Sequence, residues 1–312
     1  MKIKAVFMGT PEIARDALEA LTDVLDVVLV VTQPDKLVGR KKVLTKSPVK
    51  LLAESLEVPV FQPYKIKEEY DTITKLNPDI IVTCAYGQIL PKALLDMPKY
   101  GALNIHASLL PKYRGGAPIE RSIMNGDKKT GITLMHMDIG MDTGDIIYKE
   151  EIAIDDLDTK ETLTKKLSLL AQKIIKKNLP LYLDGEYSSI KQDESKASYA
   201  PIISKEDEYL SFNKSSLEVY NHIRALSPEP SVYALLDNKR YKFYEAKLSN
   251  LKGTPGEILA IDEALTIGTL DGAIDILSIQ EAGKKNMSAK DYFSGKNKKE
   301  YIGKRFNEEN NW

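Results

Sequence analysis

The chain has 312 residues, of which 43% are hydrophobic and 29% are charged, and its formal net charge at pH 7 is -1. A chain of this length exceeds the size at which a single core usually stops growing, so two domains are expected. The near-neutral charge excludes a protein that coats nucleic acid or membrane through bulk electrostatics, so local basic patches would have to hold any polyanionic partner.

The first half alternates short β-branched runs with segments of helical periodicity, which is typical of a parallel sheet wrapped by helices. Runs such as AVFM and VVLVV are apolar throughout and suit strands covered on both faces. The expected strands are 3–8, 27–32, 80–85, 102–106, 132–137 and 146–154. An apolar stripe from Leu163 to Ile174 predicts a helix that begins near Thr159 and lies against the sheet. We therefore predict an α/β domain over residues 1–187, with a doubly wound, mostly parallel, Rossmann-like sheet.

Residues 188–205 are polar and almost without periodicity, as expected of a linker between domains. A helix is expected at 217–226. Short strands are expected at 232–236, 241–246, 257–261, 265–269 and 274–280, with turn signals at Asp237-Asn238 and Asp271-Gly272. Five short strands over residues 206–312 indicate a small C-terminal β-barrel domain.

The densest cluster of unusual residues is the segment GALNIHASLLPKYRGGAP, where the fourth expected strand ends. Asn104 and His106 are two residues apart on that strand, so their side chains point to one face. Open α/β sheets bind ligands beyond the carboxyl ends of their strands. An amide can donate a hydrogen bond to a developing oxyanion and an imidazole can shuttle a proton, so the pair suits acyl transfer. On the pair alone, the alternative is that both side chains satisfy loop backbone groups.

A second cluster is the loop MDIGMDTGDII, which carries three aspartates among its glycines. Glycines allow a backbone to approach a ligand closely, and an aspartate there could orient the histidine and favour its protonated form. Asp142 is the expected partner of His106. Calcium binding is the alternative for such a loop, but no glutamate follows at EF-hand spacing.

The first expected strand ends in Gly9-Thr10-Pro11 and leads into a helix. Only one glycine is present, so the dinucleotide-binding fingerprint with its spaced glycines is missing and a Rossmann dehydrogenase is not expected. We interpret the segment as a tight strand-to-helix turn with Pro11 at the first helical position.

Two stretches are rich in Lys and Arg. The first, QPDKLVGRKKVLTKSPVK, has no acid after Asp35 and could grip phosphates, with a solvated surface loop as the alternative. Its basic residues are Lys36, Arg40, Lys41, Lys42, Lys46 and Lys50. The second runs from Lys284 to Arg305, with Tyr292, Phe293 and Tyr301 interleaved. Two basic patches in a neutral protein suit one elongated polyanion.

The remaining titratable candidates are interpreted as structural. Cys84 has neither a base nor a second thiol nearby in sequence, and His136 and His222 lie inside a strand and a helix. No metal-ligand spacing is present, so no metal is expected. The lone cysteine, a start that does not resemble a signal peptide and the lack of a long apolar run predict a cytoplasmic protein without a membrane partner.

Taken together, these segments resemble the folate-dependent formyltransferases. NIHASLLPKYRGGAP and DIGMDTGDI look like the two signature segments of that family almost residue for residue. The likeness continues through FMGTPEIA, VTQPDKLVGRKK, SPVK, AYGQILP, IRALSPEPSVY and KKNMSAKDYF and covers nearly the whole chain. This extent points to the branch of the family that acts on methionyl-tRNA, since shorter relatives acting on glycinamide ribonucleotide lack the basic insertion and the C-terminal barrel.

The resemblance implies a reaction and a catalytic trio. The formyl group of 10-formyltetrahydrofolate, a cosubstrate, would pass to the α-amino group of methionyl-initiator tRNA by direct attack, without an acyl-enzyme or a metal. Asn104 and protonated His106 would stabilise the tetrahedral oxyanion, and Asp142 would orient His106 and help relay protons.

The resemblance also implies the binding residues. Those expected to hold the folate are Ser108, Leu109, Leu110, Pro111, Tyr86, Gly87, Gln88, Ile89, Leu90, Asp138, Ile139, Gly140, Met141 and Gly144. Those expected to contact tRNA are Arg40, Lys41, Lys42 and Lys36, on an insertion that resembles the family loop entering the acceptor stem. The C-terminal barrel resembles an OB-like fold that tracks the RNA backbone, and a monomer is expected. Relatives often carry an aromatic residue in place of Glu229, a departure that concerns the second domain and not the chemistry.

Three other functions remain open at this point. An amino-sugar-nucleotide N-formyltransferase is similar in the catalytic motifs and in a trailing small domain, but the basic segment 36–50 counts against it. A 10-formyltetrahydrofolate hydrolase would use the same groups to activate water, which product analysis would reveal. An RNA-binding module with a degenerate catalytic fold is disfavoured by the intact Asn104, His106 and Asp142.

Overall fold

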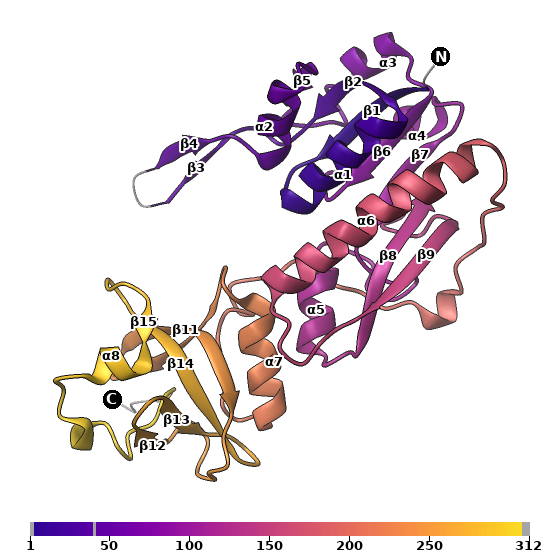
Figure 1. Cartoon of the computed structure of the whole chain (residues 1–312). Helices are drawn as coiled ribbons and strands as arrows, with labels where there is room; N and C mark the ends of the chain where they lie inside the picture. The colour runs from indigo at the N-terminus through magenta and orange to yellow at the C-terminus, as the bar shows by residue number, and fades with distance from the viewer. Residues whose placement is uncertain (1–2, 40–41, 308–312) are drawn as a thin grey trace. The chain divides into compact units, whose positions relative to one another are not determined.

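The structure is a computed structural model and describes residues 3–39 and 42–307. Contacts divide the chain into two compact units, coloured along the chain in Figure 1. The first unit consists of Met1–Pro118, Lys129–Ala153 and Thr164–Pro201, and the second of Ile119–Lys128, Ile154–Leu163 and Ile202–Trp312. Two short segments that precede Thr164 in the chain therefore belong with the C-terminal unit.

In the first unit, the described residues form a seven-stranded sheet in the order β5-β2-β1-β6-β7-β8-β9. The strands are β1 Lys4–Gly9, β2 Asp26–Val31, β5 Val60–Phe61, β6 Ile80–Cys84, β7 Ala102–His106, β8 Lys129–His136 and β9 Ile146–Ala153. The pairs from β5 through β7 are parallel, and β8 and β9 add antiparallel edges. The predicted α/β fold with a mostly parallel sheet is confirmed.

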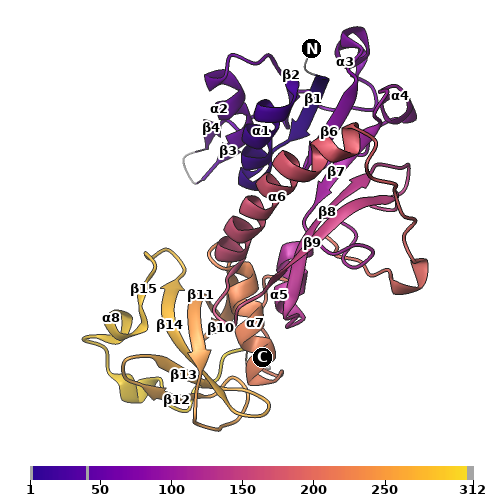
Figure 2. The ribbon, with the colours of Figure 1, turned by 45° about the vertical axis from the view of Figure 1, so that its right-hand side comes forward.

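Helices cover both faces of this sheet. They are α1 Glu12–Val24, α2 Pro48–Ser55, α3 Asp71–Leu76, α4 Lys92–Asp96 and α6 Lys160–Leu183, whose first turn belongs to the second unit. Helix α5 Pro118–Met124 belongs to the second unit from Ile119 on. On one face α1 and α6 lie side by side, with Lys176 paired to Asp23 at 2.8 Å (Figure 2). On the other face Ile73 of α3 and Leu94 of α4 share a buried cluster with Val6 of β1. The sheet is doubly wound for this reason.

Local chemistry explains how two of these helices begin. Gly9 ends β1 where an added Cβ would lie 2.6 Å from the Cβ of Ala14, so only glycine allows the strand to turn this closely into α1. Pro11 caps α1 one position earlier than predicted. The Ser47 hydroxyl accepts a 3.1 Å hydrogen bond from the Lys50 amide, which caps α2 and explains the SPVK motif.

The basic segment of the first unit forms a β-ribbon, which the sequence did not predict. Strands β3 Lys36–Val38 and β4 Val43–Thr45 pair with each other and with no other strand of the described chain. They extend away from the main sheet (Figure 1). Leu37, Val43 and Leu44 are exposed there, so no core holds the ribbon in place.

The second unit is built on an antiparallel sheet in the order β10-β11-β14-β13-β12, with β15 paired to β14. Its strands are β10 Val232–Leu236, β11 Lys239–Leu248, β12 Ile258–Ile261, β13 Leu265–Gly268, β14 Ala273–Glu281 and β15 Met287–Ser288, and its helices are α7 Ser216–Leu226 and α8 Ala289–Phe293. Single 3-10 turns lie at Glu194–Lys196 in the first unit and at Lys298–Glu300 in the second. The strands and helix expected for this half are present as a C-terminal antiparallel β-sheet domain.

Asp237 and Asn238 join β10 to β11 with φ values of 49° and 60°, as a tight hairpin turn requires. Ser215 and Glu218 form a complete capping box at the start of α7. No helix of the described residues is both long enough and apolar enough to cross a membrane.

Candidate active site

Strand β7 presents Asn104 and His106 on one face, as the two-residue period predicted. Thr83, paired with Asn104 in register on β6, donates a 2.9 Å hydrogen bond to its Oδ1. The amide nitrogen of Asn104 must therefore point the other way, where it donates to Asp142 Oδ1 at 3.2 Å. A buried threonine on the neighbouring strand thus sets the orientation of the amide.

Asp142 lies in the loop between β8 and β9, against the face of β7 that carries the other two side chains. Its Oδ2 accepts a 2.8 Å hydrogen bond from the Gly115 amide and lies 3.6 Å from His106 Nδ1. That second distance is longer than a hydrogen bond but suits an ion pair with a protonated imidazole. The structure brings together the three residues predicted to act jointly, although they come from positions as much as 38 residues apart.

His106 is 6% exposed, and both ring nitrogens face protein oxygens. Nε2 lies 2.9 Å from the carbonyl oxygen of Tyr113. A carbonyl can only accept, so Nε2 carries a hydrogen and holds the ring in place. Nδ1, with the longer contact to Asp142, is the nitrogen that a ligand oxygen could reach by displacing the weaker partner.

The loop that carries Asp142 depends on an unusual backbone. Asp142 has a φ of 55°, in the left-handed region, and Gly144 packs so tightly that an added Cβ would lie 2.0 Å from the carbonyl oxygen of His136. Ile139 and Met141, expected to contact folate, are 71% and 54% exposed. Asp138 is exposed and its carboxylate accepts from the Ile139 amide. The loop therefore has a tightly constrained backbone at Asp142 and Gly144 and exposed apolar side chains at Ile139 and Met141.

The two other segments expected to bind folate differ in exposure. In the segment 108–111, Ser108 and Leu110 are buried, and the Leu110 amide donates to Thr133 Oγ1 at 3.2 Å. Leu109 and Pro111 are half-buried.

In the segment 86–90, Tyr86 and Leu90 are buried, Gln88 is half-buried, and Gly87 and Ile89 are exposed. The Tyr86 hydroxyl is buried without a hydrogen-bond partner among the described residues, and burial raises its pKa to about 12. It remains a neutral donor available to a ligand.

The ribbon carries the residues expected to contact tRNA, and the structure divides its basic residues into two groups. Lys36 and Lys42 are exposed. Lys46 pairs with Glu54 at 2.8 Å, and Lys50 pairs with Asp35 at 2.7 Å, so their charges are partly neutralised. Arg40 and Lys41 lie outside the described residues. Lys46 and Lys50 are therefore less available to a polyanion than the sequence alone indicated.

Comparison with known proteins was made once this geometry was clear. Residues 1–179 match the family model described as formyl transferase, and residues 202–297 match the formyl transferase C-terminal domain. The methionyl-tRNA formyltransferase of Macrococcus caseolyticus is 46% identical over 98% of this chain and 99% of its own length. That of Staphylococcus epidermidis is 46% identical over 94% and 96%. The chain belongs to the methionyl-tRNA formyltransferase family.

Solved structures agree with this assignment at the level of the fold. The sugar 3N-formyltransferase WlaRD, solved with dTDP and 5-N-formyl-THF, is 26% identical, with a TM-score of 0.67 over 91% of this chain and all of its own. A methionyl-tRNA formyltransferase from Clostridium thermocellum gives a TM-score of 0.56 at 21% identity over 80% of this chain and 94% of its own.

Several residues that support this candidate site were not singled out from the sequence. Thr83, Tyr113 and Gly115 contact Asn104, His106 and Asp142 directly, as described above. The buried Arg114 binds Gln192 and Glu194 from the segment expected to be a polar linker. Only Thr83, a polar residue at the end of an apolar strand, offered a local signal.

The aromatic residues of the second basic stretch belong to the core of the C-terminal unit or pack on it. Tyr292 and Phe293 are buried in that core at 5% and 2% exposure, and the half-buried Tyr301 packs against it. The rings of Tyr292 and Phe293 are therefore engaged in the core. Lys296 lies 3.4 Å above the centroid of the Tyr292 ring, so it covers the aromatic cluster with a charge.

The remaining candidates show no arrangement for chemistry. Burial raises the pKa of Cys84 to about 12, which keeps it a thiol. Burial lowers the pKa of both His136 and His222. No group of three or more His, Cys, Asp or Glu side chains within the described ranges could hold a metal ion.

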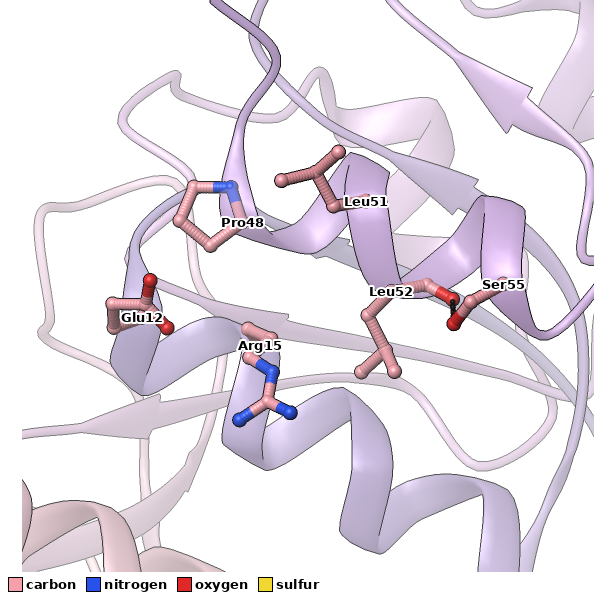
Figure 3. Close-up of a pocket in the computed structure, with 6 residues that line it drawn as sticks. All are labelled: Glu12, Arg15, Pro48, Leu51, Leu52 and Ser55. Atoms are coloured by element: carbon pink, nitrogen blue, oxygen red, sulfur yellow. Dashed lines mark hydrogen bonds between the residues drawn. The ribbon is translucent and has the colours of Figure 1, made fainter.

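A surface cavity of about 380 Å³ lies between α1 and α2, away from the trio. Its lining residues are Glu12, Arg15, Pro48, Leu51, Leu52 and Ser55 (Figure 3). Arg15 is already paired with Asp16 at 2.8 Å, and the remaining lining side chains are an acid, a hydroxyl and apolar groups. We assign no function to this cavity.

Proposed function

We propose that the chain transfers the formyl group of 10-formyltetrahydrofolate to the α-amino group of methionyl-initiator tRNA. The observation that carries the proposal is the assembly of Asn104, His106 and Asp142 in a chain that aligns over nearly its whole length with methionyl-tRNA formyltransferases. The family membership indicates the reaction class, and the trio supplies groups suited to it.

The trio can serve direct attack of the amine on the formyl carbon. Asn104 Nδ2 and His106 Nδ1 both face the Asp142 carboxylate, so two donors converge on one small region. A formyl oxygen entering that region would gain both donors as its negative charge develops. Asp142 would hold the protonated imidazole and help relay the proton that the amine loses to the folate nitrogen. That nitrogen takes back the electron pair of its bond to the formyl carbon as the tetrahedral intermediate collapses.

The cosubstrate would be held by the residues that surround this region. Exposed Ile89 and half-buried Leu109 offer apolar surface, and Tyr86 carries a hydroxyl without a hydrogen-bond partner among the described residues. The exposed Ile139 and Met141 could close over a planar ring. Solved relatives support this reading, because one carries 5-N-formyl-THF and HypX from Aquifex aeolicus was solved with tetrahydrofolic acid, at 18% identity and a TM-score of 0.63 over 94% of this chain and 47% of its own. No metal is needed for any step.

The transfer RNA would be held at two places. Lys36 and Lys42 on the ribbon would meet the acceptor stem, together with Arg40 and Lys41 outside the described residues. The C-terminal antiparallel sheet, which we interpret as an OB-like module, would follow the RNA backbone through its lysines. A reaction on charged tRNA would take place in the cytoplasm, where translation occurs.

The direct test offers 10-formyltetrahydrofolate with four acceptors in parallel: charged initiator tRNA, charged elongator tRNA, free methionine and an amino sugar nucleotide. We expect formylation of the initiator tRNA alone. Release of formate without acceptor formylation would instead assign a hydrolase.

The second candidate is a sugar N-formyltransferase, which the likeness to WlaRD favours. Its identity of 26% is well below the 46% of the methionyl-tRNA formyltransferases, and a small sugar nucleotide gives no reason for the exposed basic ribbon. Formylation of the amino sugar nucleotide in the same panel would select this candidate and overturn our proposal.

A further inference from the structure

A buried cation lies beside the catalytic loop of the first unit and has no role in the chemistry proposed above. Arg114 is 0% exposed, and burial of a charge is costly unless it is fully paired. Its Nη1 and Nη2 donate to the two carboxylate oxygens of Glu194 at 2.8 and 2.7 Å. This bidentate pair raises the pKa of Arg114 and lowers that of Glu194. The guanidinium is therefore a fixed and permanent charge.

The same guanidinium determines how Gln192 is turned. Nε and Nη2 of Arg114 donate to Gln192 Oε1 at 3.1 and 2.8 Å. Because a guanidinium can only donate, the oxygen end of the amide must face it and the nitrogen end must face away. A glutamine side chain that could otherwise rotate is thus held in one orientation.

The amide nitrogen of Gln192 donates hydrogen bonds to the backbone of the catalytic loop. Nε2 donates to the carbonyl oxygens of Asp142 at 2.8 Å and of Gly144 at 2.7 Å. Both hydrogens of the amide are used, on the two carbonyls that flank Thr143. Since Asp142 has a φ of 55°, a conformation that a residue with a side chain rarely adopts, its backbone needs such external support.

The residues flanking Arg114 hold the other parts of the trio. The Tyr113 carbonyl accepts from His106 Nε2, and the Gly115 amide donates to the Asp142 carboxylate. Residues 113–115 thus touch the imidazole, the glutamine that holds the Asp142 backbone, and the Asp142 carboxylate. The segment 198–200 runs beside them: the Arg114 amide donates to the Ser198 carbonyl at 2.8 Å, and the Ala200 amide donates to the Arg114 carbonyl at 2.7 Å.

We propose that Gln192, oriented by Arg114, is a positioning residue of the active site, so that a segment expected only to connect the domains also supplies a side chain that supports the catalytic loop. Gln192 acts through Asp142, because its amide holds the backbone that directs the Asp142 carboxylate towards Asn104 and His106. The inference rests on the proposed function for its kinetic consequence, while its structural part concerns the loop alone.

The test compares Gln192→Met with the parent enzyme. Methionine has a similar length but cannot donate to the two carbonyls, so packing is kept and the support is lost. A misplacement of catalytic groups by about 1 Å can cost about 100-fold in rate, so we expect kcat to fall about 10- to 100-fold while KM for both substrates stays within about twofold. In an Asp142→Asn background, the same change should cost less than about twofold more, because the residue through which it acts is already disabled.

The control is Lys196→Ala, in the same segment. Lys196 is exposed and pairs only with Asp193 among the ion pairs found, so its loss should leave kcat unchanged. Equal losses from Gln192→Met in the parent and Asp142→Asn backgrounds would overturn the proposal, as would a raised KM alone or an unchanged kcat.

A second readout does not need the reaction. Hydrogen exchange of peptides covering residues 110–118 and 138–146 should speed up in Gln192→Met and not in Lys196→Ala, because the Gly115 amide loses a fixed acceptor. If the parent formylated none of the four acceptors, the proposed function would fail while this measurement still decided the positioning role. Unchanged exchange in both peptides would overturn the positioning role. The measurement can be made at low temperature, so it also decides the case of a variant that is folded there but too unstable for kinetics at the assay temperature.

Discussion

The backbone amide of Gly115 donates a 2.8 Å hydrogen bond to Oδ2 of Asp142, so a glycine 27 residues away in sequence orients this carboxylate. Gly115 has a φ of 119°, and a Cβ added there would lie 2.7 Å from the Ala200 carbonyl oxygen. The backbone conformation and the close approach both require glycine. The position of the carboxylate is therefore built on a residue without a side chain.

Gly115→Ala should lose both stability and activity. Strain in the backbone and the clash with Ala200 should lower the free energy of unfolding by about 2 kcal/mol or more, and displacement of the amide should lower kcat at least about 10-fold. Denaturant unfolding and steady-state kinetics measure the two effects. The matched control is Gly185→Ala, with a φ of 81° but no atom within 4 Å, where only the cost of the conformation, about 1 kcal/mol, is expected. Equal costs at the two glycines would contradict the argument.

His106→Ala and Asp142→Asn should abolish most turnover and leave folate binding near normal. Their proposed work is on the developing oxyanion and the proton, so kcat should fall about 100-fold or more while the Kd for folate changes little. Single-turnover kinetics and fluorescence titration with folate separate the two quantities.

His136→Ala is the control, because that half-buried histidine of β8 contacts the Tyr182 ring and takes no part in the trio. Loss of folate affinity by the same factor as kcat in the Asp142 variant would remove the transition-state role.

The sequence predicted what regular periodicity determines. Apolar runs located six of the seven described strands of the main sheet and missed the two-residue strand β5. Strand β7 has the bounds expected, so the two-residue period placed Asn104 and His106 on one face correctly. Asp142 could be proposed as their partner because its loop combines acids with glycines. That the three residues lie close together could be predicted from one strand and one loop. Their catalytic roles stay predictions.

The parts that were missed depend on contacts without a local pattern. Arg114 and Gln192 are 78 residues apart, and Gln192 lies in a polar, aperiodic segment that gave no sign of structure. The ribbon β3–β4 has strands too short and too exposed for a period to show. Lys46 is neutralised by Glu54, an acid from the next helix, so a charge count along the basic run could not reveal it. In each case the structure depends on contacts between residues that are separated in the sequence.

Lys36→Ala and Lys42→Ala should each raise KM for tRNA and leave kcat and the KM for folate unchanged. Each exposed lysine that neutralises one phosphate contributes about 0.7 to 0.9 to the slope of log affinity against log salt, so each variant should show a shallower slope. Lys67→Ala, an exposed lysine of the first unit outside the ribbon, removes the same charge and serves as control. If all three variants had the same KM for tRNA, the ribbon would be an ordinary solvated loop.

The last prediction concerns acid stability of the C-terminal unit. Asp207 binds Arg121 through two hydrogen bonds of 2.8 and 2.6 Å, with side chains about one-fifth exposed, and this pairing lowers the pKa of Asp207 to about 2 from the ordinary 3.8. A depressed carboxyl pKa means that the folded state binds its proton less readily than the unfolded state.

The stabilisation from Asp207 is therefore complete above a pH of about 4 and is lost as the pH falls towards about 2, and it amounts to about 2 kcal/mol. Asp207→Asn should be less stable than the parent by about that amount at pH 7, with the gap narrowing steadily below pH 4. Urea unfolding at a series of pH values, followed by circular dichroism, measures the gap.

Asp193→Asn is the control. The pKa of Asp193 is also lowered to about 2, chiefly by the Ser195 hydroxyl, but its side chain is half exposed, so a smaller change is expected. A gap between the parent and Asp207→Asn that stayed constant from pH 7 to pH 3 would show that the ion pair does not carry the effect.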